Sequence, residues 1–230
     1  SFAQTDIWNL DGLSNLTTIG GSLKIGGNPL ITDLTGLNNL VTIGGSFETF
    51  LEGISGSVWN EQLESLSGLE NLDTIGGDIT IAYNPVLDDL SALAGIDYFH
   101  HYLSIFDNDA LSNLAGLEFV DTITWLQVTL NSSLANLSGL DNLTFVGNGI
   151  SIFQNNSLLS LTGLEQLSNV GGDLSITDNP ALTIIQALTA LTQVGDDLRI
   201  LANPSLESLS GLDNLVAVGG EYWIAENQGL

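Results

Sequence analysis

The sequence predicts an all-β fold, a parallel β-solenoid of about nine coils, and three observations support this prediction. The chain repeats itself with a period of 24 residues. Leucine, isoleucine and valine recur at fixed columns within each repeat. One stretch of each repeat alternates apolar and polar residues, as a short β-strand does. A single coil cannot bury its own apolar residues, but stacked coils bury them as continuous ladders.

The repeat is clearest at a column of asparagines. With Gln4 in the register of a leading member, the successive spacings are 24, 32, 24, 24, 23, 24, 24, 24 and 24 residues. The column consists of Asn28, Asn60, Asn84, Asn108, Asn131, Asn155, Asn179, Asn203 and Asn227. We expect these side chains to form an internal ladder, each amide bonded to corner backbone of its own or the adjacent coil. The column is therefore predicted to be structural.

Each coil is predicted to contain one short strand between two corners. In the stretch LSI at 174–176, the leucine and isoleucine are expected to face the core and the serine to face outward. The Gly-Gly pair at 171–172 precedes this strand and is expected to use the positive φ that glycine accepts. The Asn-Pro pair at 179–180 marks the next corner, because the residue before proline avoids helical geometry.

The composition excludes several classes of function. The 230 residues include 27 acidic residues and two cations, Lys24 and Arg199, giving a formal net charge of −25. Nucleic acids and anionic membranes are bound by clustered cations, so neither is expected as a partner. No apolar run approaches the roughly 20 residues of a membrane span, so no membrane insertion is expected. The absence of cysteine excludes disulfides and thiolate metal sites.

The repeat resembles that of the receptor L-domain family, which is related to leucine-rich repeats. The pattern L.sLsGLenL..IGGdLsI..NP.L covers essentially the whole chain, as in LESLSGLDNLVAVGGEYWIAEN at 206–227. The resemblance implies a right-handed β-solenoid and extracellular recognition, and it is nearest in pattern to bacterial secreted members. We therefore expect a secreted or cell-surface protein. The stretch SFAQ at 1–4 is similar to the end of a secretory signal.

An insertion at residues 48–59 interrupts the second coil of a chain that otherwise forms one domain over 1–230. It reads ETFLEGISGSVW and adds eight residues between Phe47 and Asn60. Its apolar members are Phe50, Leu51, Ile54, Val58 and Trp59. Two interpretations stay open, a flap packed against the side of the solenoid and a binding loop on a rigid scaffold.

Aromatic residues replace small or acidic ones at outward strand positions of consecutive coils. The stretch HHYLSIFDN at 100–108 carries two of them, Tyr102 and Phe106. Because parallel strands lie about 4.8 Å apart, neighbouring coils are expected to share one patch. Two interpretations stay open, an exposed binding patch and rings that the insertion or flanking sequence covers. Its predicted ligand-binding residues are Tyr102, Ser104, Phe106, Trp125, Gln127 and Phe153. One coil is a residue short near Thr124, so the backbone beside the patch is expected to be altered.

Catalytic and metal-binding residues are not predicted. His100 and His101 are the only histidines, and adjacent residues of a strand point to opposite faces. The chain lacks the G-x-S-x-G, phosphate-binding glycine-loop and HExxH motifs. No cofactor is expected beyond weak Ca²⁺ binding, for which oxygen ligands are offered by the pairs Asp88-Asp89, Asp196-Asp197 and Asp107 with Asp109.

These observations favour a non-catalytic module for extracellular recognition or adhesion. Rings flanked by serine and glutamine suit a ligand with apolar faces and polar edges, such as a glycan or a peptide. An alternative is a structural subunit that self-associates through open solenoid ends into a filament, using Ile7, Leu10, Trp223 and Ile224. Ice binding would require a regular array of threonine, which the outward strand column does not provide.

Overall fold

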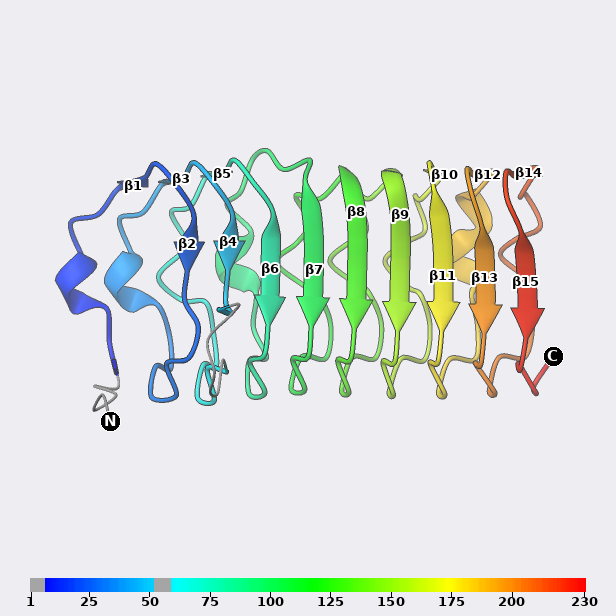
Figure 1. Cartoon of the computed structure of the whole chain (residues 1–230), viewed down its shortest axis with the longest axis horizontal. Coiled ribbons are helices and arrows are strands. Elements are labelled where there is room, and N and C mark those ends of the chain that lie inside the picture. The colour runs from blue at the N-terminus through cyan, green and yellow to red at the C-terminus, as the bar shows by residue number, and fades with distance from the viewer. Residues whose placement is uncertain (1–6, 52–58) are drawn as a thin grey trace.

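The computed structural model describes residues 7–51 and 59–230 and shows a parallel β-solenoid shaped as a rod (Figure 1). Within these ranges, nine strands lie side by side along one long face and point in the same direction (Figure 1). They are β2 (Leu23–Lys24), β4 (Phe47–Glu48), β6 (Ile79–Ala82), β7 (Tyr102–Phe106), β8 (Thr122–Thr129), β9 (Phe145–Phe153), β11 (Asp173–Thr177), β13 (Leu198–Leu201) and β15 (Tyr222–Ala225). Each pairs in parallel with its neighbour in the next coil. The predicted fold class is confirmed.

A second row of short strands forms the corner that precedes the long face. It consists of β1 (Thr18–Ile19), β3 (Thr42–Ile43), β5 (Thr74–Ile75), β10 (Asn169–Val170), β12 (Gln193–Val194) and β14 (Ala217–Val218). The strands β8 and β9 run through this corner without a break and are therefore eight and nine residues long. Their pairing shifts register between Ile123 and Trp125. The altered backbone that was expected near Thr124 is confirmed.

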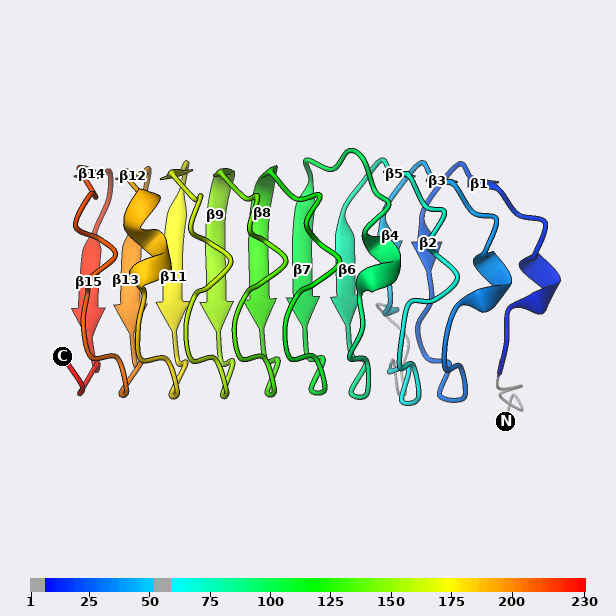
Figure 2. The ribbon, with the colours of Figure 1, turned by 180° about the vertical axis from the view of Figure 1, so that it is seen from behind.

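Irregular backbone with short 3₁₀ turns forms the opposite side of the rod, which Figure 2 shows. The 3₁₀ turns of the described ranges are η1 (Asp11–Leu13), η2 (Thr35–Leu37), η3 (Ser91–Leu93) and η4 (Gln186–Ala190). None of the helices in residues 7–51 and 59–230 is long and apolar enough to cross a membrane. The residues suggested as a secretory signal, 1–4, lie outside the described ranges.

The core is a stack of apolar ladders that follow the sequence columns. Leu174 and Ile176 of β11 are fully buried, whereas Ser175 between them is partly exposed, as the alternation predicted. One ladder consists of Leu34, Leu66, Leu90, Leu114, Leu137, Leu161 and Ile185, each at most 1% exposed. Full burial of a leucine or isoleucine contributes about 1.5–3 kcal/mol. The repeated ladders thus supply the main stabilising term for a chain that has no cysteine and whose described residues form no long helix.

The asparagine column forms a hydrogen-bonded ladder inside the corner that follows the long face. The amide nitrogen of Asn131 donates to the backbone oxygens of Ile105 and Thr129, both at 3.0 Å. It also lies 3.2 Å from Oδ1 of Asn155. Its own Oδ1 accepts the backbone N–H of Asn108 at 3.1 Å. All members except the two at the ends of the column are fully buried, so the ladder satisfies backbone groups that the curved corner leaves without partners.

The residue before most ladder asparagines adopts a left-handed conformation. Positive φ angles of 54° to 61° occur at Tyr83, Asp107, Leu130, Gln154, Asp178, Ala202 and Glu226. Each costs roughly 1–2 kcal/mol, which the adjacent buried ladder offsets. The Gly-Gly pair at 171–172 does not use positive φ, so that prediction is wrong. Glycine is required there because neighbouring coils approach closely: a Cβ at Gly172 would lie 1.6 Å from the backbone oxygen of Asn148.

Candidate ligand-binding site

The outward face of β6, β7 and β8 contains a hollow of about 300 Å³. Its lining residues are Phe50, Thr80, Ala82, Tyr83, Tyr102, Ser104, Phe106 and Gln127. We call this space the aromatic hollow, because half of these residues carry a ring. The other lining residues are small or uncharged, and no lining residue is acidic or basic.

The hollow arises from the order of small and large residues on β7 and its neighbours. Tyr102 and Phe106 stand on the outward side of one strand, four residues and therefore about 13 Å apart. Between them lies Ser104, which is paired in register with Thr80 on β6 and Gln127 on β8. Small side chains at Thr80 and Ser104 leave space that the flanking rings enclose. The local sequence, large-x-small-x-large, thus creates a depression on the outward face of the sheet.

Polar groups at one end of the hollow form a small hydrogen-bonded set. Oδ1 of Asp78 accepts the backbone N–H of Tyr102 at 3.0 Å. The Tyr102 hydroxyl donates to Oε1 of Gln127, and the Ser104 hydroxyl lies 3.4 Å from the same oxygen. Burial raises the pKa of Tyr102, partly opposed by Ser104 and reinforced by Asp78, so its hydroxyl remains a donor. The amide nitrogen of Gln127 has no hydrogen-bond partner among the described residues and is available to a ligand.

A cluster of rings closes the other end of the hollow. The ring of Tyr83 meets that of Phe106 edge to face, with centroids 5.0 Å apart. It also lies 6.3 Å from the ring of Phe50 and stacks on Trp59 at 6.1 Å. Each such pair contributes about 0.5–1.5 kcal/mol beyond simple burial. The rings therefore hold one another in place without a ligand.

Four of the six predicted ligand-binding residues line the hollow, and two do not. Tyr102, Ser104, Phe106 and Gln127 line the hollow together. Trp125 does not line it but stacks in parallel on Tyr102, with centroids 6.4 Å apart and planes 8° apart. Phe153 lies two strands from Phe106 in the same register, with Thr129 between them, and does not line the hollow.

The sequence analysis did not identify Tyr83 as a site residue, and it named Phe50 only as an apolar residue of the insertion. A comparison of the residues that precede each ladder asparagine would have identified Tyr83, because rings occur there only in two adjacent coils, as Trp59 and Tyr83. Phe50 and Trp59 belong to the two ends of the insertion and contact the hollow or its ring cluster. The insertion residues Ile54 and Val58 lie outside the described ranges.

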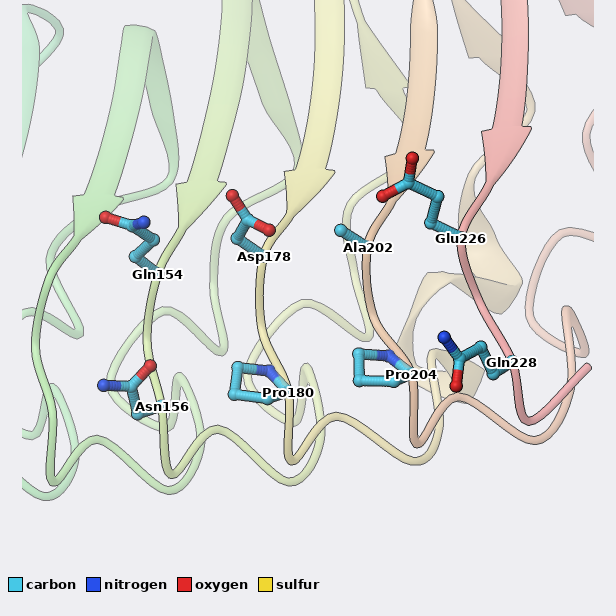
Figure 3. Close-up of a pocket in the computed structure, with 8 residues that line it drawn as sticks. All are labelled: Gln154, Asn156, Asp178, Pro180, Ala202, Pro204, Glu226 and Gln228. Atoms are coloured by element: carbon cyan, nitrogen blue, oxygen red, sulfur yellow. The ribbon is translucent and has the colours of Figure 1, made fainter.

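A second, larger groove follows the corner of the last coils and holds about 480 Å³ (Figure 3). Two rows of side chains line it, namely Gln154, Asp178, Ala202 and Glu226, and Asn156, Pro180, Pro204 and Gln228. Its carboxylates, Asp178 and Glu226, stand two coils or about 10 Å apart. The groove thus offers neither rings nor a compact set of ligating oxygens. Within the described part of the chain, no group of three or more His, Asp or Glu residues is arranged to hold a metal ion.

The two histidines and Arg199 make local contacts away from the hollow. Nδ1 of His100 lies 2.7 Å from both the backbone oxygen and the hydroxyl of Thr122. His101 packs edge to face against Phe99, so the two histidines have separate environments. Arg199 pairs with Asp173 and Asp197, and its guanidinium lies 5.8 Å from the ring centroid of Trp223. These groups have structural partners already.

The fold and the site together define the chain as a β-solenoid repeat protein with one aromatic hollow on its long sheet. No model of a known protein family matches the chain, and no curated protein matches its sequence. The chemistry of the hollow is therefore the basis for assigning a function.

Proposed function

We propose that this protein is a non-catalytic recognition module, secreted or exposed at a cell surface, that binds part of a glycan or peptide in the aromatic hollow. The observation that carries the proposal is the preformed hollow itself, in which small residues are surrounded by four rings. Concave, mostly apolar spaces with a few placed polar groups are the usual form of small-ligand sites.

Two further observations support ligand binding at this position. The rings of Tyr83 and Phe106 are already held by mutual contact, so a ligand loses little affinity to the ordering of side chains. The amide nitrogen of Gln127, which bonds to no other residue in the described ranges, supplies a directional donor beside the apolar walls. An extracellular location agrees with the resemblance of the repeat to receptor L-domains and with the strongly acidic composition.

The test is a matched pair of substitutions combined with glycan and peptide arrays. Ser104→Leu fills the hollow without removing a ring, while Ser175→Leu places the same side chain at the same outward column of β11, three strands away. We expect array ligands of the wild type to lose binding to Ser104→Leu and to retain it on Ser175→Leu. Circular dichroism confirms that both variants fold. Equal binding by both variants would place the ligand elsewhere and refute the proposal.

A second candidate function, self-association of chains into a filament, is favoured by the exposed rings of β15. Within the described residues β15 pairs with β13 on one side, and Tyr222 and Trp223 are 53% and 50% exposed. Large exposed apolar rings often mark an interaction surface. Light scattering and negative-stain microscopy over a concentration series test this candidate. Fibres that disappear in Trp223→Asp would support it, and a monomer at all concentrations would reject it.

A further inference from the structure

The charge distribution around the aromatic hollow is uneven. The lining itself contains no charged side chain, but acidic residues stand at both ends of β7. Asp78 bonds to the backbone of Tyr102, and Asp107 directly follows Phe106. The whole chain has a formal net charge of −25. A ligand that enters the hollow therefore meets neutral rings inside a strongly negative field.

We propose that the group bound in the aromatic hollow is a weakly hydrated organic cation, a quaternary or methylated ammonium. This inference rests on the proposed function, because it concerns the same hollow. Aromatic faces attract a cation that lies within about 6 Å of the ring centroid. Four of the eight lining residues carry rings, with Tyr102 at one end of the hollow and Phe106 and Tyr83 at the other, so a cation bound there meets aromatic surface at both ends.

Other ligand chemistries fit the lining less well. Anions are repelled by the net charge and find no cation among the lining residues. A sugar ring requires a hydrogen-bond partner for nearly every hydroxyl that it buries. The lining offers three polar side chains besides its tyrosines, and the hydroxyl of Ser104 already faces the amide oxygen of Gln127. Phe50 and Phe106 contribute apolar ring surface alone, which suits methyl groups on nitrogen.

A primary ammonium fits less well than a methylated one for reasons of hydration. The ammonium of an unmodified lysine is compact and strongly hydrated, and it requires acceptors when it leaves water. No carboxylate lines the hollow to accept its three N–H bonds. Methylation removes those donors and spreads the charge over an apolar surface. Two sources share this chemistry, a free molecule such as choline and a methylated lysine side chain on a peptide.

The decisive measurement compares choline with dimethylbutanol, its neutral isostere in which carbon replaces the ammonium nitrogen. Titration calorimetry on the full chain should show choline binding roughly ten-fold or more tightly than dimethylbutanol, because only the cation is attracted by the rings. Phe106→Leu retains apolar bulk but removes one ring. We expect it to weaken choline roughly five- to thirty-fold and to change dimethylbutanol binding little. Phe153→Leu, at the same register two strands away, should change neither.

A further arm distinguishes the two sources of the cation. A peptide with trimethyllysine that binds more tightly than both choline and the unmodified lysine peptide would identify a peptide side chain as the source. Choline binding without that gain would identify a small molecule. Equal affinity for choline and dimethylbutanol, or no binding of either choline or the trimethyllysine peptide by the folded protein, would overturn the inference.

The inference and the proposed function can fail separately. An array ligand without a cationic group that loses binding in Ser104→Leu would leave the recognition function in place and overturn the cation inference. Absence of any ligand that depends on the hollow would overturn both.

Discussion

Removal of one central rung of the asparagine ladder should destabilise the solenoid strongly. Asn131→Ala deletes an amide that donates to two backbone oxygens at 3.0 Å and accepts the backbone N–H of Asn108 at 3.1 Å. The backbone oxygen of Thr129 retains the N–H of Asp107 at 3.0 Å. The N–H of Asn108 retains no other acceptor among the described residues. The variant therefore loses these three hydrogen bonds and the longer contacts with the side chains of Asn155 and Asn108, and it leaves a buried donor unsatisfied.

The expected magnitude follows from these contacts. Two of these hydrogen bonds contribute about 1 kcal/mol each, and loss of the third leaves a buried donor without a partner at a cost of about 1–3 kcal/mol, so the total loss is about 3–5 kcal/mol. Asn28→Ala is the matched control, because Asn28 is partly exposed and its amide donates to one backbone oxygen, that of Gly26 at 3.1 Å. We expect the control to lose about 1 kcal/mol.

Urea unfolding followed by both tryptophan fluorescence and circular dichroism measures the difference. Coincident transitions are needed before a single free energy of unfolding is assigned, since end coils of a solenoid can unfold separately. A loss for Asn131→Ala within about 1 kcal/mol of that for Asn28→Ala would refute the reasoning. The regular column would then reflect something other than satisfaction of corner backbone.

Three other variants test separate features. Gly172→Ala should cost more than about 3 kcal/mol or prevent folding, because its Cβ would lie 1.6 Å from a backbone oxygen; Gly147→Ala, whose Cβ meets nothing within 3.7 Å, should cost less than about 1 kcal/mol in the same urea titration. Thr129→Val should raise the melting temperature, since the buried hydroxyl of Thr129 has no hydrogen-bond partner, whereas Thr177→Val should not, because Thr177 bonds to a serine hydroxyl at 3.1 Å. Burial and the nearby Asp109 raise the pKa of Asp107, so folding favours its protonated form and its ionisation destabilises the native state. Asp107→Asn should therefore be slightly more stable than the wild type at pH 7, by less than about 1 kcal/mol, and the gap should close as the pH falls below about 4; a gap that widens in acid would contradict this.

The fold was predictable from the sequence because every coil has apolar residues at the same positions and must bury them in the same way. Each apolar column marks a position that faces the core. The location of each strand, its inward face and the direction in which the coils stack therefore followed from the 24-residue spacing of these columns. The Gly-Gly corner was misjudged for a physical reason. Positive φ and close approach of a neighbouring backbone both require the absence of a Cβ, and the residue type alone does not separate them. Only the 1.6 Å approach at Gly172 decides between them.

The candidate site was predictable in part. Tyr102 and Phe106 could be placed on one outward strand face by alternation alone, and Ser104 and Gln127 followed from parallel register. The hollow also depends on Tyr83 and Phe50, which lie in a corner and in the insertion, where no strand alternation applies. Phe153 was grouped with them by spacing along the rod, but the intervening β8 separates it from Phe106.

At the left-handed corner position, which precedes most ladder asparagines, the backbone conformation does not depend on which side chain is present. Its conformation is fixed by the buried asparagine that follows, and the position itself carries tyrosine, aspartate, leucine, glutamine, alanine and glutamate in different coils. Tyr83 at this position lines the aromatic hollow, and Gln154, Asp178, Ala202 and Glu226 line the corner groove (Figure 3). Substitution of one residue per coil, at steps of about 4.8 Å, would change the chemistry of a continuous surface while the core stays intact. The solenoid therefore offers a scaffold whose specificity can be rewritten coil by coil.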